Sequence, residues 1–199
     1  MGAIVAIEKD GVVYLAADAN KECCGGNFYV NKESNLRLHK MPSGIIVATI
    51  GPMHTSERLW LHDEWFELAE GEVFDKKFIV TKLIPRFYES IKDMDVWETN
   101  DNKMVNMLDA MFILAKGADI YVILNDLSVF KGNKIVAISD EDKDRCSMFF
   151  DAMSCSEKDP EKLLKKTFES VARRTSQVST HGFIINTRDF TLKKMEDVE

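Results

Sequence analysis

The chain has 199 residues, of which 45% are hydrophobic and 30% charged, as expected of one globular domain with a substantial core. We therefore expect a single domain over residues 1–199. The net charge of −7 argues against nucleic acids and anionic membranes as partners, because both attract basic surfaces.

A β-hairpin is predicted at the very start of the chain. Ala3 to Ile7 and Val12 to Ala17 are apolar runs, and Asp10-Gly11 between them is typical of a turn whose residues take positive φ. Chain ends usually fray unless something holds them. A terminus held in a sheet raises the hypothesis that its first residue, or its amine, has or once had a chemical role.

The rest of the chain divides into blocks of strands and blocks of helices. A polar loop over residues 19–34, with a short strand around Phe28 to Val30, comes first. The later elements are predicted as strands over 36–41 and 45–50, a helix capped by Thr55 or Ser56, a helix over 75–94, strands over 111–115, 120–124 and 134–138, a helix over 144–155, a helix starting at Asp159-Pro160-Glu161, and strands over 183–186 and 190–195. Pro85 is expected either to kink the helix over 75–94 or to mark the first turn of its second half.

This order predicts the fold class. Strands and helices that come in separate blocks favour antiparallel sheets covered by helices over a doubly wound parallel sheet. We therefore expect an α+β protein, a four-layer αββα sandwich of two antiparallel sheets flanked by helix pairs.

Several stretches resemble the proteasome β-subunit and HslV branch of the N-terminal-nucleophile hydrolases. "IVAIEKDGVVYLAAD" is similar to the opening hairpin of that family and "NLRLHKMPSGIIVATIGP" to its next hairpin. "KGADIYVILNDLSVF" resembles the central hairpin, "KIVAIS" the strand before the third helix, and the stretch from Asp159 to Phe190 the last helix and closing strands. The resemblance implies an Ntn-hydrolase sandwich over nearly the whole chain.

The resemblance also implies a site, and this sequence departs from it. Family members begin with a threonine whose hydroxyl attacks the scissile carbonyl while its amine acts as base. That position falls at Met1 or Gly2 here, and the lysine of the family falls at Arg37. Only the aspartate and the glycine of the family are matched, by Asp18 and Gly51.

Two further positions of the family site are not matched either. The Ser-Gly pair falls around Asp140 and Glu141, and the later aspartate near Arg174 or Gln177. No catalytic residue is assigned firmly, and we treat Gly2, Asp18 and Arg37 as the remnant site, with Asp18 and Arg37 expected within ion-pair reach.

The leading hypothesis is a proteasome-like subunit without threonine peptidase chemistry, a pseudoenzyme that is a structural or binding member of a homo-oligomer (a ring or smaller). The resemblance allows an ATPase or unfoldase, or a paralogous subunit, as a further partner. One alternative is an amidohydrolase or peptidase that uses the Gly2 α-amine after removal of Met1. The other is a small-ligand binding protein in which Asp18 and Arg37 recognise a polar group in the residual cleft.

No cofactor or metal is expected. His54 and His62, with Asp63 and Glu64, lack the H-E-x-x-H spacing of a zinc site. The four cysteines make no C-x-x-C pair, which is consistent with reduced thiols. No apolar run approaches the roughly 20 residues of a membrane helix, and no targeting segment is visible. We therefore expect a cytoplasmic protein.

Overall fold

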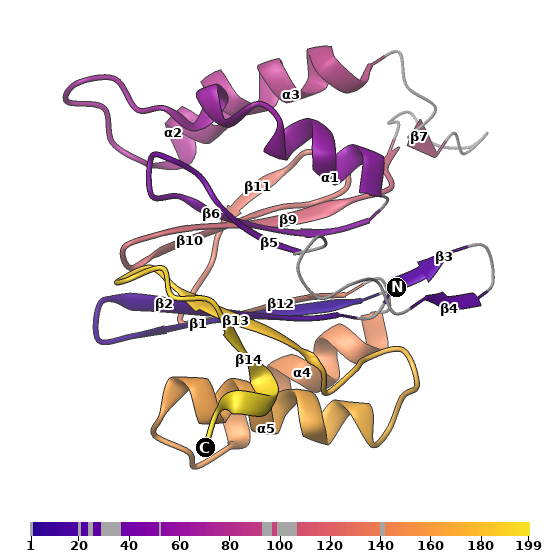
Figure 1. Ribbon diagram of the computed structural model, residues 1–199. Helices are drawn as coiled ribbons and strands as arrows, with labels where there is room; N and C mark the ends of the chain where they lie inside the picture. The colour runs from indigo at the N-terminus through magenta and orange to yellow at the C-terminus, as the bar shows by residue number, and fades with distance from the viewer. Residues whose placement is uncertain are drawn as a thin grey trace.

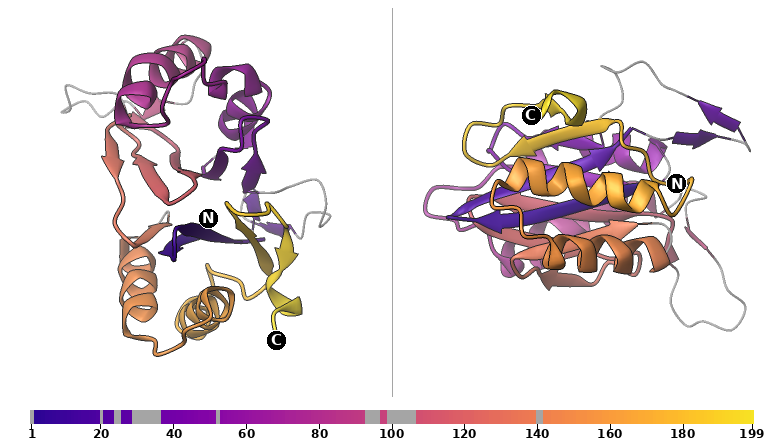
Figure 2. Two further views of the ribbon diagram at one scale, coloured as in Figure 1. Left: turned by 90° about the vertical axis from the view of Figure 1, so that its left-hand side faces the viewer. Right: turned by 90° about the horizontal axis from the view of Figure 1, so that it is seen from below.

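Two stacked antiparallel sheets with helices on both outer faces form the structure (Figure 1, Figure 2). The computed structural model describes residues 2–19, 21–23, 26–28, 37–51, 53–92, 97–98, 107–139 and 142–199. The order of layers is helices, sheet, sheet, helices. The predicted α+β class and αββα sandwich are therefore confirmed.

The lower sheet of Figure 1 holds the N-terminal hairpin at its centre. Its strands are, in spatial order, β12 (Ile135–Ser139), β1 (Ala3–Lys9), β2 (Val12–Asp18), β13 (Gly182–Asn186) and β14 (Lys193–Lys194). The hairpin turns at Asp10 and Gly11, with φ of 52° and 79°, as the Asp-Gly dipeptide predicts. Because β1 lies between β12 and β2, the chain is fixed inside the sheet from Ala3 onward.

The upper sheet contains the central hairpin of the chain. Its strands are, in spatial order, β11 (Val129–Lys131), β10 (Asp119–Ile123), β9 (Met111–Lys116), β6 (Ile46–Ile50) and β5 (Leu38–Lys40). Two small pairs join β3 (Lys21–Cys23) to β4 (Gly26–Phe28) and β7 (Trp97–Glu98) to β8 (Met107–Leu108). Strand β11 was not predicted from the sequence, because an edge strand of three residues is too short to show an alternating pattern. Of the strand expected around Phe28 to Val30, only Phe28 lies in β4, and residues 29–30 lie outside the described residues.

The two sheets pack through side chains from their facing surfaces. This inner core includes Ile4 and Leu15 of the lower sheet and Ile46 and Ile113 of the upper sheet, all buried. The opposite faces of the sheets are buried under helices as well. Burial on both faces explains why β1 reads as a continuous apolar run rather than as an alternating strand.

The upper helical layer departs most from the sequence prediction. It consists of α1 (Met53–Trp60), the 3-10 helix η1 (Asp63–Phe66), α2 (Lys76–Phe78), the π-helix η2 (Ile79–Leu83) and α3 (Ile84–Ile91). The predicted cap at Thr55 or Ser56 is wrong, because α1 already begins at Met53 and the Thr55 side chain is buried. The continuous helix over 75–94 is also wrong, since it changes to π geometry and ends at Ile91.

Pro85 gives the physical reason for the π-helical turns. Proline has no N–H and its ring collides with the carbonyl four residues earlier in a regular α-helix. Just before it, the N–H of Ile84 bonds to the carbonyl of Ile79, five residues back. The wider turn accommodates the proline without ending the helical run. Pro85 lies in the first turn of α3, which confirms one of the two sequence predictions, a new first turn, over the other, a kink.

The lower helical layer is α4 (Asp142–Ser154) and α5 (Pro160–Ala172), which lie side by side beneath the lower sheet (Figure 2). Buried Met148, Leu164 and Phe168 pack against Ala3 and Val5 of β1. A short 3-10 helix, η3 (Met195–Asp197), follows β14. None of the helices within the described ranges has the length and apolar character needed to cross a bilayer.

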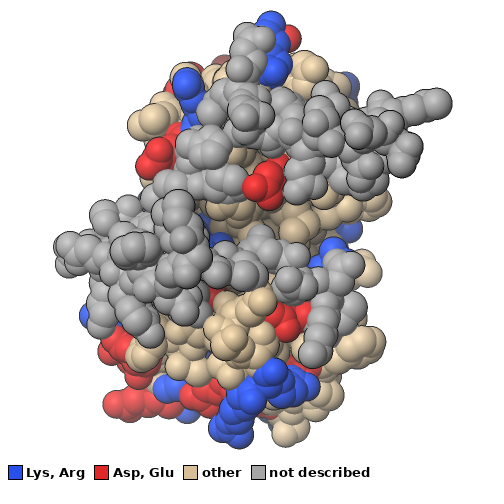
Figure 3. All heavy atoms as spheres, turned by 90° about the vertical axis from the view of Figure 1, so that its right-hand side faces the viewer, with Lys and Arg blue, Asp and Glu red and all other residues tan. Residues whose placement is uncertain are grey.

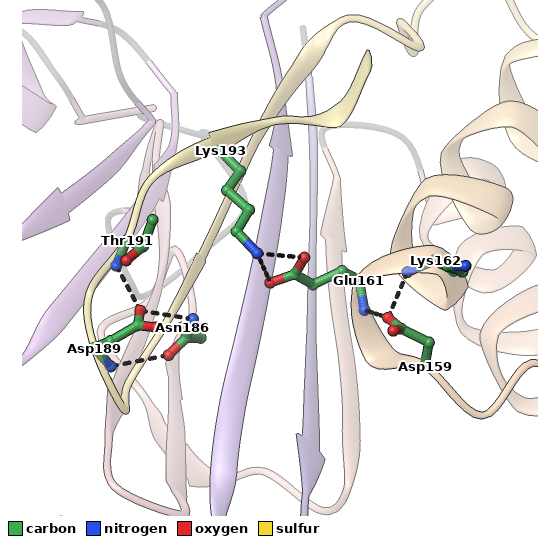
Figure 4. A network of polar contacts seen from close by, with 7 residues as sticks. All are labelled: Asp159, Glu161, Lys162, Asn186, Asp189, Thr191 and Lys193. Atoms are coloured by element: carbon green, nitrogen blue, oxygen red, sulfur yellow. Dashed lines mark hydrogen bonds and ion pairs between the residues drawn. The ribbon is translucent and has the colours of Figure 1, made fainter. Parts of the chain in front are cut away.

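The start of α5 is held by a polar network (Figure 4). The Asp159 carboxylate accepts hydrogen bonds from the Glu161 and Lys162 amides at 2.9 and 3.1 Å, as a helix N-cap does. Glu161 in turn binds Lys193 of β14 through both carboxylate oxygens, each at 2.8 Å. The predicted helix start at Asp159-Pro160 is confirmed, and the cap ties α5 to the edge of the sheet.

Replacing Asp159 by Ala should lower the free energy of unfolding by about 1 kcal/mol, because two amides of the first turn lose their acceptor. Urea denaturation of both variants measures this loss, and Lys162→Ala at an exposed position of the same turn is the control. A loss no larger than that of Lys162→Ala would contradict the capping role.

The closing strand is shorter than the predicted 190–195. Asn186 Oδ1 accepts hydrogen bonds from the Arg188 and Asp189 amides, and Phe190 has a φ of 59°. This side-chain-supported turn holds the chain out of the sheet up to Leu192 (Figure 4). Pairing with β13 is therefore limited to Lys193 and Lys194.

Candidate functional site

The three remnant-site residues converge at the end of the lower sheet where the chain begins. Gly2 precedes β1, Asp18 ends β2, and Arg37 precedes β5. Asp18 Oδ1 accepts a hydrogen bond from the Ala3 amide at 3.0 Å and lies 3.5 Å from Arg37 Nε. The predicted ion pair between Asp18 and Arg37 is therefore confirmed.

This ion pair joins the two sheets. Asp18 belongs to β2 of the lower sheet, whereas Arg37 immediately precedes β5 of the upper sheet. The Arg37 carbonyl accepts a hydrogen bond from the Thr49 amide of β6 at 2.8 Å, which fixes its backbone to the upper sheet. Only 2% of Asp18 and 9% of Arg37 is exposed, so the contact is buried.

The Arg37 guanidinium lies directly against Gly2. A Cβ atom placed on Gly2 would be 2.1 Å from Cζ, 2.2 Å from Nη2 and 2.3 Å from Nη1 of Arg37. These separations are far inside van der Waals contact, so a side chain at position 2 and the guanidinium cannot share this space. The space next to the Gly2 Cα, where a nucleophilic side chain would begin, is filled by Arg37.

The environment of Asp18 changes its acidity. Burial raises the pKa of the Asp18 carboxyl from 3.8 to about 6, because the charged form loses its hydration. The Arg37 charge and hydrogen bonds from the Ala3 and Ser179 amides lower the pKa but offset only part of this effect. Desolvation therefore outweighs the ion pair.

Ser139 is a site residue that the sequence analysis missed. It ends β12 and is the register partner of Ala3, and its buried hydroxyl donates a hydrogen bond to the Gly2 carbonyl at 3.1 Å. The resemblance puts the Ser-Gly position of the family around Asp140 and Glu141, which lie outside the described residues. Pairing the "KIVAIS" strand with the first hairpin strand would have located Ser139.

The other expected positions do not join the site. Arg174 forms an exposed ion pair with Asp151. The Gln177 amide donates to Thr175 Oγ1 at 3.2 Å, and that hydroxyl donates to Asp144. The segment after α5 instead contributes the Ser179 amide, which donates to Asp18 Oδ2 at 3.3 Å.

Gly51 has a conformational role that its own geometry explains. Its φ is 130°, and a Cβ there would lie 2.4 Å from the Asp109 carbonyl oxygen. Only glycine tolerates this combination.

The described residues contain no group of three or more His, Cys, Asp or Glu side chains arranged to hold a metal. His62 stacks on Trp65 with ring centroids 4.2 Å apart, and its Nδ1 lies 2.9 Å from Glu64 Oε1. The His54 side chain lies outside the described set.

Figure 3 views the end of the molecule at which the chain begins. The described charged side chains visible on this face carry both signs. The Asp18 carboxyl and the Arg37 guanidinium are buried and add no charge to the surface.

Comparison with known proteins identifies the fold. No family model and no curated protein matches the chain. Among solved structures, Thiobacillus denitrificans BPH has a TM-score of 0.70 at 13% identity, with 98% of this chain and 100% of that chain covered. HslV from Trypanosoma brucei has a TM-score of 0.59 at 15% identity, covering 92% and 98% of the two chains.

A third structure, Anbu (ancestral beta-subunit) from Yersinia bercovieri, has a TM-score of 0.65 at 13% identity, with 98% of this chain and 88% of that chain covered. The chain therefore has an Ntn-hydrolase sandwich fold, in the form that HslV and proteasome β-type proteins adopt. At these identities the likeness establishes the fold alone.

Proposed function

We propose that this protein is a non-catalytic proteasome-type subunit, a structural or binding member of an oligomer. The observation that carries the proposal is the Arg37 guanidinium, which fills the space beside Gly2 where a nucleophilic side chain would begin. Glycine offers no hydroxyl or thiol to attack a carbonyl. Arg37 of the protein itself therefore occupies the place of a nucleophilic side chain, and we call this closed site around Gly2, Asp18 and Arg37 the sealed site.

The remaining polar groups support the same function. An arginine side chain stays protonated in proteins and cannot exchange protons as a lysine can. Arg37 is paired with Asp18, and the Ser139 hydroxyl is bonded to the Gly2 carbonyl. These contacts suit a structural connection between the sheets better than a catalytic proton relay.

An oligomer is supported by apolar side chains exposed on α4. Phe150 and Met153 of α4 are 64% and 59% exposed, and Phe149 packs edge-to-face on Phe150 at 5.9 Å. Clustered apolar side chains on a surface are typical of protein contacts. Anbu, a fold neighbour, is described as a beta-subunit. A homo-oligomer, a ring or smaller, is our expectation; an ATPase or a paralogous subunit stays a prediction.

We expect background hydrolysis of peptide and amide substrates, together with an oligomer in sedimentation velocity experiments. Epoxomicin, which one BPH structure contains, should produce no thermal shift and no mass change here, with BPH as the positive control. Hydrolysis above background that Asp18→Asn abolishes would overturn the non-catalytic assignment. A monomer at all concentrations would overturn the oligomer.

The two alternative hypotheses are not favoured by the contacts at the site. A ligand-binding cleft requires Asp18 and Arg37 to face a ligand, whereas they face each other. An amidohydrolase based on the Gly2 amine requires an open space beside it for the scissile carbonyl, and the guanidinium occupies the side of the Cα.

A further inference from the structure

One carboxyl group holds four segments of the chain together at the sealed site. From its place at the end of β2, Asp18 accepts hydrogen bonds from the Ala3 amide of β1 and from the Ser179 amide beyond α5. It also pairs with Arg37, which leads into β5 of the other sheet. Both carboxylate oxygens are used, and the side chain is fully buried.

We propose that Asp18 is a proton-dependent clamp, in which one proton on its carboxyl sets how tightly these four segments close over Gly2. The inference concerns what controls closure of the segments around Gly2. It rests on the proposed function only because it deals with the same site. Opening means separation of these segments far enough for water to reach the carboxyl. The amides of Ala3 and Ser179 then lose their acceptor and exchange with solvent.

The direction of the effect follows from the two environments of the carboxyl. Burial raises the pKa of Asp18 in the closed form to about 6, whereas a hydrated carboxyl in the open form has its ordinary pKa near 3.8. The closed form therefore binds the proton more tightly, so protonation favours closure. As the pH rises from about 4 to about 6, the open form should gain about 30-fold over the closed form.

The charged groups around Asp18 decide which controls are needed. Arg37 and the amino group of the chain both lower the pKa of Asp18. His181 precedes Gly182, the register partner of Asp18, and its ring lies 3.1 Å from Glu196 Oε2 at the surface. Because histidine rings change charge near this pH range, His181 must be tested separately.

Native-state hydrogen exchange of the full chain tests the clamp. Exchange of the Ala3 and Ser179 amides, corrected for intrinsic rates, should rise about 30-fold between pH 4 and pH 6 in the wild type. Asp18→Asn should remove this dependence, and His181→Gln should retain it. A flat wild-type profile, an opposite sign, or a dependence that survives Asp18→Asn would overturn the proposal.

A second measurement needs no variant and covers the case in which Asp18→Asn fails to fold. The carboxyl carbon of Asp18 in the wild type, followed by NMR, should titrate with a midpoint near pH 6, the value to which burial raises its pKa. A midpoint at or below pH 4 would overturn the clamp. Neither measurement reads hydrolysis, so failure of the clamp and failure of the non-catalytic assignment are distinguishable.

Discussion

Replacing Arg37 by Met is expected to lower the free energy of unfolding by about 3 to 5 kcal/mol at pH 8, because the Asp18 carboxylate stays buried without its counter-ion. Met keeps much of the apolar length of the arginine side chain, so the loss reports charge more than packing. Urea denaturation measures it. The result is a direct measure of what the ion pair between the sheets contributes.

The same variant has a predictable pH dependence. Arg37 lowers the pKa of Asp18, so its removal should raise that pKa further, and Asp18 can then escape the penalty by binding a proton. The cost of Arg37→Met should therefore shrink between pH 8 and pH 5. A cost that stays constant over this range would show that Arg37 stabilises the protein mainly by packing.

Arg174→Met is the matched control for this experiment. Arg174 also pairs with an aspartate, Asp151, but its side chain is half exposed. Pairs in water contribute only about 0 to 1 kcal/mol. If the two Arg→Met variants lose the same free energy, burial of the Asp18 pair has no special role.

Gly2→Thr should lower the free energy of unfolding by about 1 to 3 kcal/mol, the usual cost of adding a side chain to filled space. The clash is with the end of a long side chain, but the ion pair and burial of Arg37 resist its displacement. Gly2→Ala adds only the Cβ atom. Comparing the urea denaturation of the two variants therefore separates the cost of the Cβ clash with Arg37 from the cost of the remaining threonine atoms. No loss in either variant would mean that the guanidinium moves freely.

A double variant separates steric exclusion from other effects of Gly2→Thr. If the clash is with Arg37, the cost of threonine should be smaller when Arg37 is already Ala, with a coupling of about 1 kcal/mol or more. Peptidase activity should stay at background in Gly2→Thr combined with Arg37→Lys, because other family positions are not matched. Robust activity would mean that the site is more intact than its sequence indicates.

The four layers and most of the strands could be predicted from the sequence alone. Apolar runs, the Asp10-Gly11 turn and the Asp159-Pro160 helix start are local signals, and the hydrogen bonds that they predict form between near neighbours in the chain. The resemblance to proteasome-type proteins then placed Asp18 beside Arg37. Local signals failed at the start of α1, and around Pro85 they left a kink and a new first turn as alternatives. Burial in the helical layer and a different hydrogen-bond pattern decided the helix geometry at these places.

Only the tertiary structure decided what the site can do. The Ser139 hydroxyl and the Gly2 carbonyl are 137 positions apart in the chain, and no local pattern links them. The contact of the Arg37 guanidinium with Gly2 depends on how two sheets stack, and the raised pKa of Asp18 depends on how completely that stacking excludes water. Residue types are set by the sequence, but the space and water around each one are properties of the packed fold.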